Sequence, residues 1–177
     1  MRPHLNSFTL IEILVIIGIL TLLTSFLLLY GRAGEQQIIL FREQAKVISL
    51  IFRAKSLALS TPIEEEPACG YGVHFEEDSY FIFRDIALGG VVNCPVSDKV
   101  YSSQNPEELL SGQERQLDPQ IHFSSLPIRD VLFVPYAPQA FLDGSNTLNE
   151  AQLRLSPLDE SLGANIIINN VGQVSSQ

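Results

Sequence analysis

The sequence contains few side chains of the kinds that carry metal or thiol chemistry. It has two cysteines and three histidines in 177 residues, and the spacing of Cys69 and Cys94 does not resemble a zinc site, which needs four closely spaced ligands. No nucleophile elbow, zinc-protease helix, phosphate-binding loop or dinucleotide fingerprint is present. His74 and His122 fall in expected strands, where a histidine is usually a packed or surface residue. The sequence therefore predicts a protein that is not an enzyme and holds no cofactor or metal.

Basic side chains are also scarce, and the sequence shows no run of them. Lysine and arginine number 11 against 20 acidic residues, which gives a net charge of -9. A surface of this charge repels nucleic acid backbones and anionic lipid head groups. Nucleic acid is therefore disfavoured as a partner, although Arg115, Arg129 and Arg154 could still gather into a local basic patch.

The longest stretch without a charged residue lies near the N-terminus, from Ile13 to Tyr30. As a helix, residues 8–30 would span about 35 Å, enough to cross a bilayer core of about 30 Å. The run is too long for a cleaved signal peptide, and no small-residue cleavage site follows it. A plain signal anchor fits the length but leaves Glu12 unexplained, because a charge inside a membrane helix costs about 2.5 kcal/mol or more.

Cleavage of the chain before Phe8 would explain the carboxylate of Glu12. The new N-terminus would carry an ammonium group on Phe8, four residues before that carboxylate. In a filament of packed helices, Glu12 of one subunit can pair with the ammonium group of a neighbour. Each buried charge then has a partner, and the pairing fixes the axial register between subunits.

The residues MRPHLNS-FTLIEILVIIGIL resemble the N-terminus of type IV prepilins and type II secretion pseudopilins. The family pattern is a short leader with a basic residue, a small residue that is usually Gly (here Ser7), then F-T-L-I-E and an apolar helix. The resemblance implies that a prepilin peptidase cuts between Ser7 and Phe8, methylates the Phe8 amine, and leaves Glu12 to act in assembly. With Arg2 in the leader, it also implies a single-pass protein of the inner (cytoplasmic) membrane whose C-terminal domain is extracytoplasmic.

Residues 35–60 predict one long helix that ends at Thr61-Pro62. Its polar side chains recur at three- and four-residue steps and form one narrow stripe. The stripe consists of Glu35, Arg42, Lys46, Ser49, Arg53, Ser56 and Ser60. Much of the remaining surface is apolar, so the helix must be covered on most of its circumference. Either its own domain alone covers it, or neighbouring subunits cover part of it.

The rest of the chain predicts strands and loops. Residues 71–75 and 80–86 give a hairpin signal, and the continuous apolar run at 80–84 indicates a strand covered on both faces. The other expected strands are residues 88–94, 121–124, 131–134 and 151–158, and a last hairpin at 165–176 that turns at 170–172. The expected loops are residues 95–116, with a short helical turn near PEELL, and 135–149.

One long helix followed by strands predicts an α+β fold, in which the helix packs on antiparallel sheet. The same order of elements occurs in H-type minor pseudopilins. A looser resemblance to these proteins is found in the segments AKSLALSTP, CGYGVHF and the closing IIINNVGQV. The resemblance implies a pilin-like fold. The expected domains are a leader (1–7), a transmembrane and filament-core helix (8–30), its amphipathic continuation (31–61) and a β-rich domain (62–177). If that domain is exported, Cys69 and Cys94 could form a disulfide; the alternative is two unpaired thiols.

The resemblance implies a structural subunit, of the minor class, of a type IV pilus or type II secretion pseudopilus. Its expected partners are other pilin or pseudopilin subunits, the prepilin peptidase, the inner-membrane assembly platform and the membrane. The alternative is an extracytoplasmic binding module or adhesin on an uncleaved anchor. In that case residues 1–7 would persist and Glu12 would be dispensable.

Overall fold

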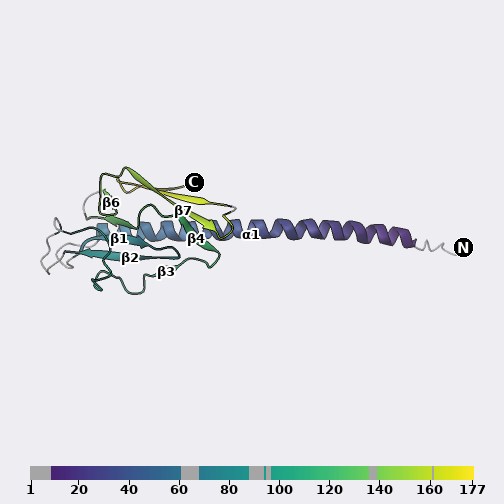
Figure 1. Cartoon of the computed structure of the whole chain (residues 1–177), viewed down its shortest axis with the longest axis horizontal. Helices are drawn as coiled ribbons and strands as arrows, with labels where there is room; N and C mark the ends of the chain where they lie inside the picture. Colours follow the sequence, from purple (N-terminus) through teal and green to yellow (C-terminus); the bar gives the residue numbers. More distant parts are fainter. Residues whose placement is uncertain (1–8, 61–67, 88–93, 95–96, 136–138, 161) are drawn as a thin grey trace. The chain divides into compact units, whose positions relative to one another are not determined.

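The computed structural model describes residues 9–60, 68–87, 94, 97–135, 139–160 and 162–177, and of residues 28–33 the backbone alone. In this part of the chain, helix α1 (Leu10–Ser60) is followed by strands (Figure 1). The strands are β1 (Ala68–Phe75), β2 (Ser79–Ile86), β3 (Arg115–Gln116), β4 (Ile121–Ser125), β5 (Asp130–Phe133), β6 (Ala140–Leu142), β7 (Glu150–Pro157), β8 (Ala164–Asn169) and β9 (Val174–Ser176). The fold class is α+β, as predicted.

The chain divides into two units, Met1–Ile38 and Ile39–Gln177. The first contains the N-terminal part of α1, and the second contains the rest of α1 with all the described strands. The helix runs without a break through Gly31 and Gly34 and ends at Ser60, just before the predicted stop at Thr61-Pro62.

The strands form two antiparallel sheets. One has the order β3-β2-β1-β5-β6 and the other the order β4-β7-β8-β9. The predicted hairpins are both present: β1 pairs with β2, with Phe75 opposite Tyr80, and β8 pairs with β9. Gly172 in the last turn has a φ of 71°, a left-handed conformation that glycine adopts without steric cost.

One hydrophobic core joins the second part of α1 to both sheets. Val47 and Ile51 of the helix belong to the same buried cluster as Ile82 of β2 and Leu153 of β7. Strands β7 and β8 alternate buried and more exposed residues along most of their length, so each turns one face to this core. The helix therefore completes the core of the β-rich domain, and a chain lacking residues 39–60 would leave both sheets uncovered on that side.

Strand β2 is covered on both faces, as its continuous apolar run predicted. Tyr80 and Ile82 belong to the main core, whereas Phe81 and Phe83 form a second cluster with Leu132 of β5. Half-buried side chains, among them Tyr101, pack against this second cluster. The long connection after β2 thus covers the sheet face that lies away from the helix.

The predictions for several short segments were wrong. The expected loop at 135–149 contains β6, and the expected loop at 95–116 ends in β3. The helical turn predicted near PEELL is absent; instead, Leu109 forms an isolated β-bridge with Phe83. Of the strand expected at 88–94, residues 88–93 lie outside the described residues, and Cys94 is not in a strand.

Candidate functional site

The first described segment of α1 is almost entirely apolar and has no cover from the described chain. Every side chain from Leu10 to Leu27 is exposed, and the mean hydropathy of these 18 residues is 2.6. By length and composition the segment is able to cross a membrane. A helix that is apolar all round requires apolar surroundings, either lipid or other helices.

The hydroxyl groups of this segment are satisfied inside the helix itself. Thr21 Oγ1 donates to the carbonyl oxygens of Ile17 and Gly18, at 3.0 and 2.9 Å. Thr24 Oγ1 and Ser25 Oγ donate in the same way to carbonyls one turn earlier, at 2.9 and 2.8 Å. In an apolar medium an unpaired hydroxyl is costly. Because their hydroxyl groups are already hydrogen-bonded, these three side chains add little to the cost of placing the helix in an apolar medium.

Glu12 is the only charged residue between Leu10 and Leu27, and it lies in the first turn of α1. Its backbone N–H is 3.3 Å from Thr9 Oγ1 and 3.1 Å from the Thr9 carbonyl oxygen, so Thr9 caps the helix. The spacing Thr-x-x-Glu is that of a capping box, and a carboxylate at this end also interacts favourably with the helix dipole. Thr9 was missed by sequence reasoning, although the letters TLIE carry the signal. Ser7 and Phe8, the predicted cleavage and methylation site, lie outside the described residues.

From Ile39 onward, α1 has three sides of different character. The side that packs on the sheets contains the buried residues Leu40, Glu43, Gln44, Val47, Leu50, Ile51, Ala54 and Ala58. A second side carries exposed polar residues, as the predicted stripe required, among them Arg42, Lys46 and Arg53. The third side is apolar and exposed: Phe41, Phe52 and Leu59 are 49%, 49% and 57% exposed.

We call Phe41, Phe52 and Leu59 the apolar line. They are eleven and seven residues apart, close to whole numbers of helical turns, so they lie along one side of α1. Of the two alternatives left open by the sequence, cover by its own domain alone does not hold for the residues described. The apolar line is a surface that a second molecule can bury.

Two polar residues, Glu43 and Gln44, lie on the buried side of α1, a position that was not predicted for them. Glu43 is fully buried; its Oε1 lies 2.8 Å from Lys46 Nζ and 3.5 Å from Arg42 Nε, and its Oε2 has no partner in the part of the chain described. Gln44 Nε2 donates to the carbonyl oxygen of Asn165 in β8 at 2.9 Å. A buried carboxylate is tolerated when cations pair with it, so Glu43 holds Arg42 and Lys46 in place on the neighbouring side.

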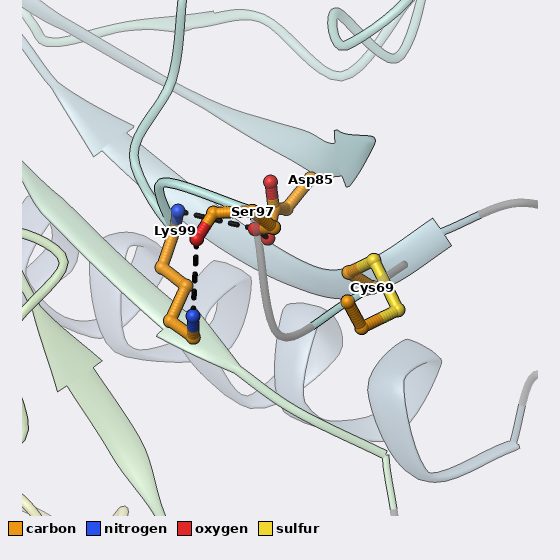
Figure 2. The surroundings of a disulfide bond; sticks show 5 residues. Cys69, Asp85, Ser97 and Lys99 are labelled. Atoms are coloured by element: carbon orange, nitrogen blue, oxygen red, sulfur yellow. Dashed lines mark hydrogen bonds between the residues drawn. A yellow bond between two sulfur atoms is a disulfide. The ribbon is translucent and has the colours of Figure 1, made fainter. Parts of the chain in front are cut away.

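Cys69 and Cys94 are joined by a disulfide bond in the structure (Figure 2). Cys69 is buried in β1, at the point where the register with β2 shifts between Ala68 and Gly70. A cavity of about 150 Å³ beside the bond is lined by both cysteines, Asp85 and Lys99, among others. The disulfide therefore ties the start of β1 to the connection that follows β2.

Asp85 is fully buried next to this cavity and has an incomplete set of partners. The Ser97 hydroxyl donates a short hydrogen bond to Asp85 Oδ2, whereas Oδ1 has no partner among the described residues (Figure 2). Burial raises the pKa of Asp85 above its ordinary value, and the hydrogen bond from Ser97 offsets this only in part. Lys99 Nζ donates instead to the Ser97 carbonyl oxygen, at 3.1 Å. At neutral pH the Asp85 carboxylate therefore destabilises the folded chain.

An Asp85→Asn chain is expected to be more stable than the wild type near neutral pH, by about 1–2 kcal/mol in free energy of unfolding. A raised folded pKa means that stability is fully present below the ordinary value of 3.8 and falls as pH rises through the folded pKa. Asparagine removes the charge and keeps the shape, so the gain should vanish at about pH 3.5. Denaturant unfolding of both chains at the two pH values measures this. Ser97→Ala, which removes the hydrogen bond, should be less stable near neutral pH; an equal gain for Asp85→Asn at both pH values contradicts the account.

The described histidines lie in packed surroundings. His74 Nδ1 is 2.8 Å from Asp130 Oδ1, and its ring packs against Phe81 and Tyr101. His122 is half-buried, with no partner for Nδ1 in the described part of the chain. Across the residues described, no three or more His, Cys, Asp or Glu side chains are grouped as metal ligands.

Comparison with known proteins adds no relative to this picture. No protein-family model, curated protein or solved structure matches the chain. The resemblance to prepilins therefore depends on the N-terminal motif and the order of the elements.

Proposed function

We propose that the chain is a structural subunit, of the minor class, of a type IV pilus or type II secretion pseudopilus, with a pilin-like fold. The observation that carries the proposal is the N-terminal segment of α1. It has eighteen exposed and largely apolar residues, and its single carboxylate, Glu12, lies in the first turn. That combination is costly in a solitary anchor and is satisfied when neighbouring helices bring a positive charge to Glu12.

The helix surface in the second unit supports the same proposal. The apolar line remains exposed although the opposite side of α1 is fully packed. Large exposed apolar side chains that recur along one side of a helix can be buried by another helix. In a filament, neighbouring helices cover both the apolar line and the apolar N-terminal segment. Packing between subunits therefore explains why both surfaces are exposed in the single chain.

The assembled subunit acts by polymerising. Its N-terminal helix packs among those of its neighbours, and the Phe8 ammonium of one subunit pairs with Glu12 of another. The β-rich domain lies on the outside of the filament, where a disulfide such as Cys69–Cys94 persists in the oxidising extracytoplasmic space. Extension and retraction are driven by a separate motor ATPase, as the family resemblance implies.

The experiment that tests the proposal is the intact mass and N-terminal sequence of the chain from its native membrane. We expect a chain that begins at Phe8 and is heavier by about 14 Da, the mass of one methyl group, than the unmodified sequence. Processing and methylation together provide the charged partner that Glu12 requires.

A Ser7→Gly chain is the control, because it carries the usual residue before the cut and should be processed at least as completely. A wild-type chain that still begins at Met1, when Ser7→Gly begins at Phe8, shows that Ser7 blocks the cut. If both chains begin at Met1, the filament proposal fails and the anchored binding module or adhesin becomes the better account.

A further inference from the structure

A groove of about 560 Å³ lies between α1 and the edge strand β3, wholly within the Ile39–Gln177 unit. Four basic side chains line it: Arg42, Lys46 and Arg53 from the helix and Arg115 from β3. No acidic side chain is among the residues that line it. In a chain with net charge -9, this is a local concentration of positive charge.

The cations of the groove are of two kinds. Arg42 and Lys46 are held by carboxylates: Arg42 Nη2 lies 3.3 Å from Asp118 Oδ2, and Lys46 Nζ lies 2.8 Å from the buried Glu43. Arg53 and Arg115 have no described carboxylate within 4.0 Å, and the Arg115 side chain is bonded to a backbone carbonyl at 3.4 Å. The groove thus offers two guanidinium groups whose charge the described chain leaves unpaired.

Uncharged side chains also line the groove. Leu50 and Tyr80, both buried in the core, line it together with Ala45. Burial and then Glu43 raise the pKa of Tyr80 to about 12, against a smaller lowering by Arg115, so its hydroxyl stays protonated at physiological pH. Leu50 and Tyr80 expose almost no surface, so the groove selects its ligand chiefly by charge.

The dimensions indicate an extended ligand. Arg42, Lys46 and Arg53 lie on one side of α1 over eleven residues, a rise of about 16 Å. An extended peptide of five residues covers the same length, at about 3.3 Å per residue. On the other side of the groove, β3 is the edge of its sheet, and an edge strand presents backbone groups that can pair with an extended segment.

We propose that this groove binds a short, extended acidic segment of a partner protein. Carboxylates of the segment lie against the helix cations and Arg115, which line the two sides of the groove. Arginine forks fit planar carboxylates with paired hydrogen bonds. A long polyanion such as nucleic acid fits less well, because the acidic remainder of the chain repels it beyond the groove. The site does not depend on filament formation.

The test uses the full chain in non-ionic detergent micelles and a fluorescein-labelled peptide, Glu-Val-Glu-Val-Glu, at low salt. We expect saturable binding by fluorescence anisotropy, and none with Gln-Val-Gln-Val-Gln. The double variant Arg53→Gln/Arg115→Gln should weaken binding at least tenfold. The exposed Arg129→Gln loses the same kind of charge away from the groove and should bind as the wild type does. Arg53→Lys/Arg115→Lys keeps the charge but loses the paired hydrogen bonds, so it should weaken binding, though less than the double glutamine variant does.

Each other outcome overturns the proposal. If no saturable binding occurs, or if Arg129→Gln weakens binding as much as the double variant, the groove is not a specific site. If inorganic phosphate displaces the peptide at equal concentration, the groove holds a simple anion. If a single-stranded oligonucleotide binds more tightly and is lost in the same double variant, the partner is nucleic acid. Circular dichroism of each variant ensures that lost binding is not lost folding.

Discussion

A Glu12→Gln chain is expected to reach the membrane in normal amount but to enter filaments at least a hundredfold less than the wild type. The substitution keeps the Thr9 cap, because Thr9 Oγ1 accepts its hydrogen bond from the backbone N–H of residue 12. It removes only the negative charge, so in the proposed filament the ammonium group of a neighbouring subunit would be left unpaired in an apolar surrounding, at a cost of about 3–5 kcal/mol. The measurement is an immunoblot of sheared filaments against the membrane fraction in cells that hold the assembly machinery.

A Thr9→Ala chain is the matched control for the local role of Glu12. It weakens the helix cap by about 1 kcal/mol and leaves the charge in place, so assembly should fall only slightly. If Glu12→Gln assembles normally, the carboxylate serves the helix start alone. If Thr9→Ala is as defective as Glu12→Gln, the cap and not the charge pair limits assembly.

Replacing Cys69 and Cys94 with alanine is expected to lower the free energy of unfolding of the Ile39–Gln177 unit by about 3 kcal/mol. The bond closes a loop between residues 25 apart, and opening it returns conformational entropy to the unfolded chain. For a domain of this size the loss corresponds to a fall in Tm of roughly 10 °C. Thermal unfolding followed by circular dichroism measures it.

The wild type with a reducing agent should unfold at the temperature of the double variant, and the double variant should be insensitive to the reducing agent. If the wild type and the double variant have the same Tm, with and without the reducing agent, the disulfide makes no net contribution and the entropy argument fails here. If Tm falls only when one of the two cysteines is replaced by alanine, and not when both are, the remaining free thiol causes the destabilisation.

The sequence predicted the elements that are long enough to show a periodic pattern of side chains. The β1–β2 hairpin has eight residues in each strand, and β7 alternates over most of its length. Strand β6 has three residues, and its place depends on pairing with β5, with Leu142 opposite Val131. So short a segment shows no periodicity, and its structure depends on a partner that a local pattern does not reveal.

The candidate functional surfaces were likewise predicted only where a local sequence pattern reveals them. Glu12 was predicted because the motif around it is continuous in sequence, and the apolar character of α1 was predicted because helical spacing reveals it. The groove was not predicted, because Arg115 joins the helix cations only through the pairing of β3 with β2. The sequence suggested Arg115 with Arg129 and Arg154, but Arg154 lines a different hollow, with Glu150.

The disulfide also has a mechanical consequence. It bridges the ends of a stretch that contains all of β2 and nearly all of β1. When the folded chain is pulled from its two ends, tension passes through the bond, and the bridged stretch does not extend. About 85 Å of chain, at 3.4 Å per residue over the 25 bridged positions, is then withheld from the extension of each subunit. If the chain forms a filament as proposed, an oxidised filament is expected to be less extensible at high load than a reduced one.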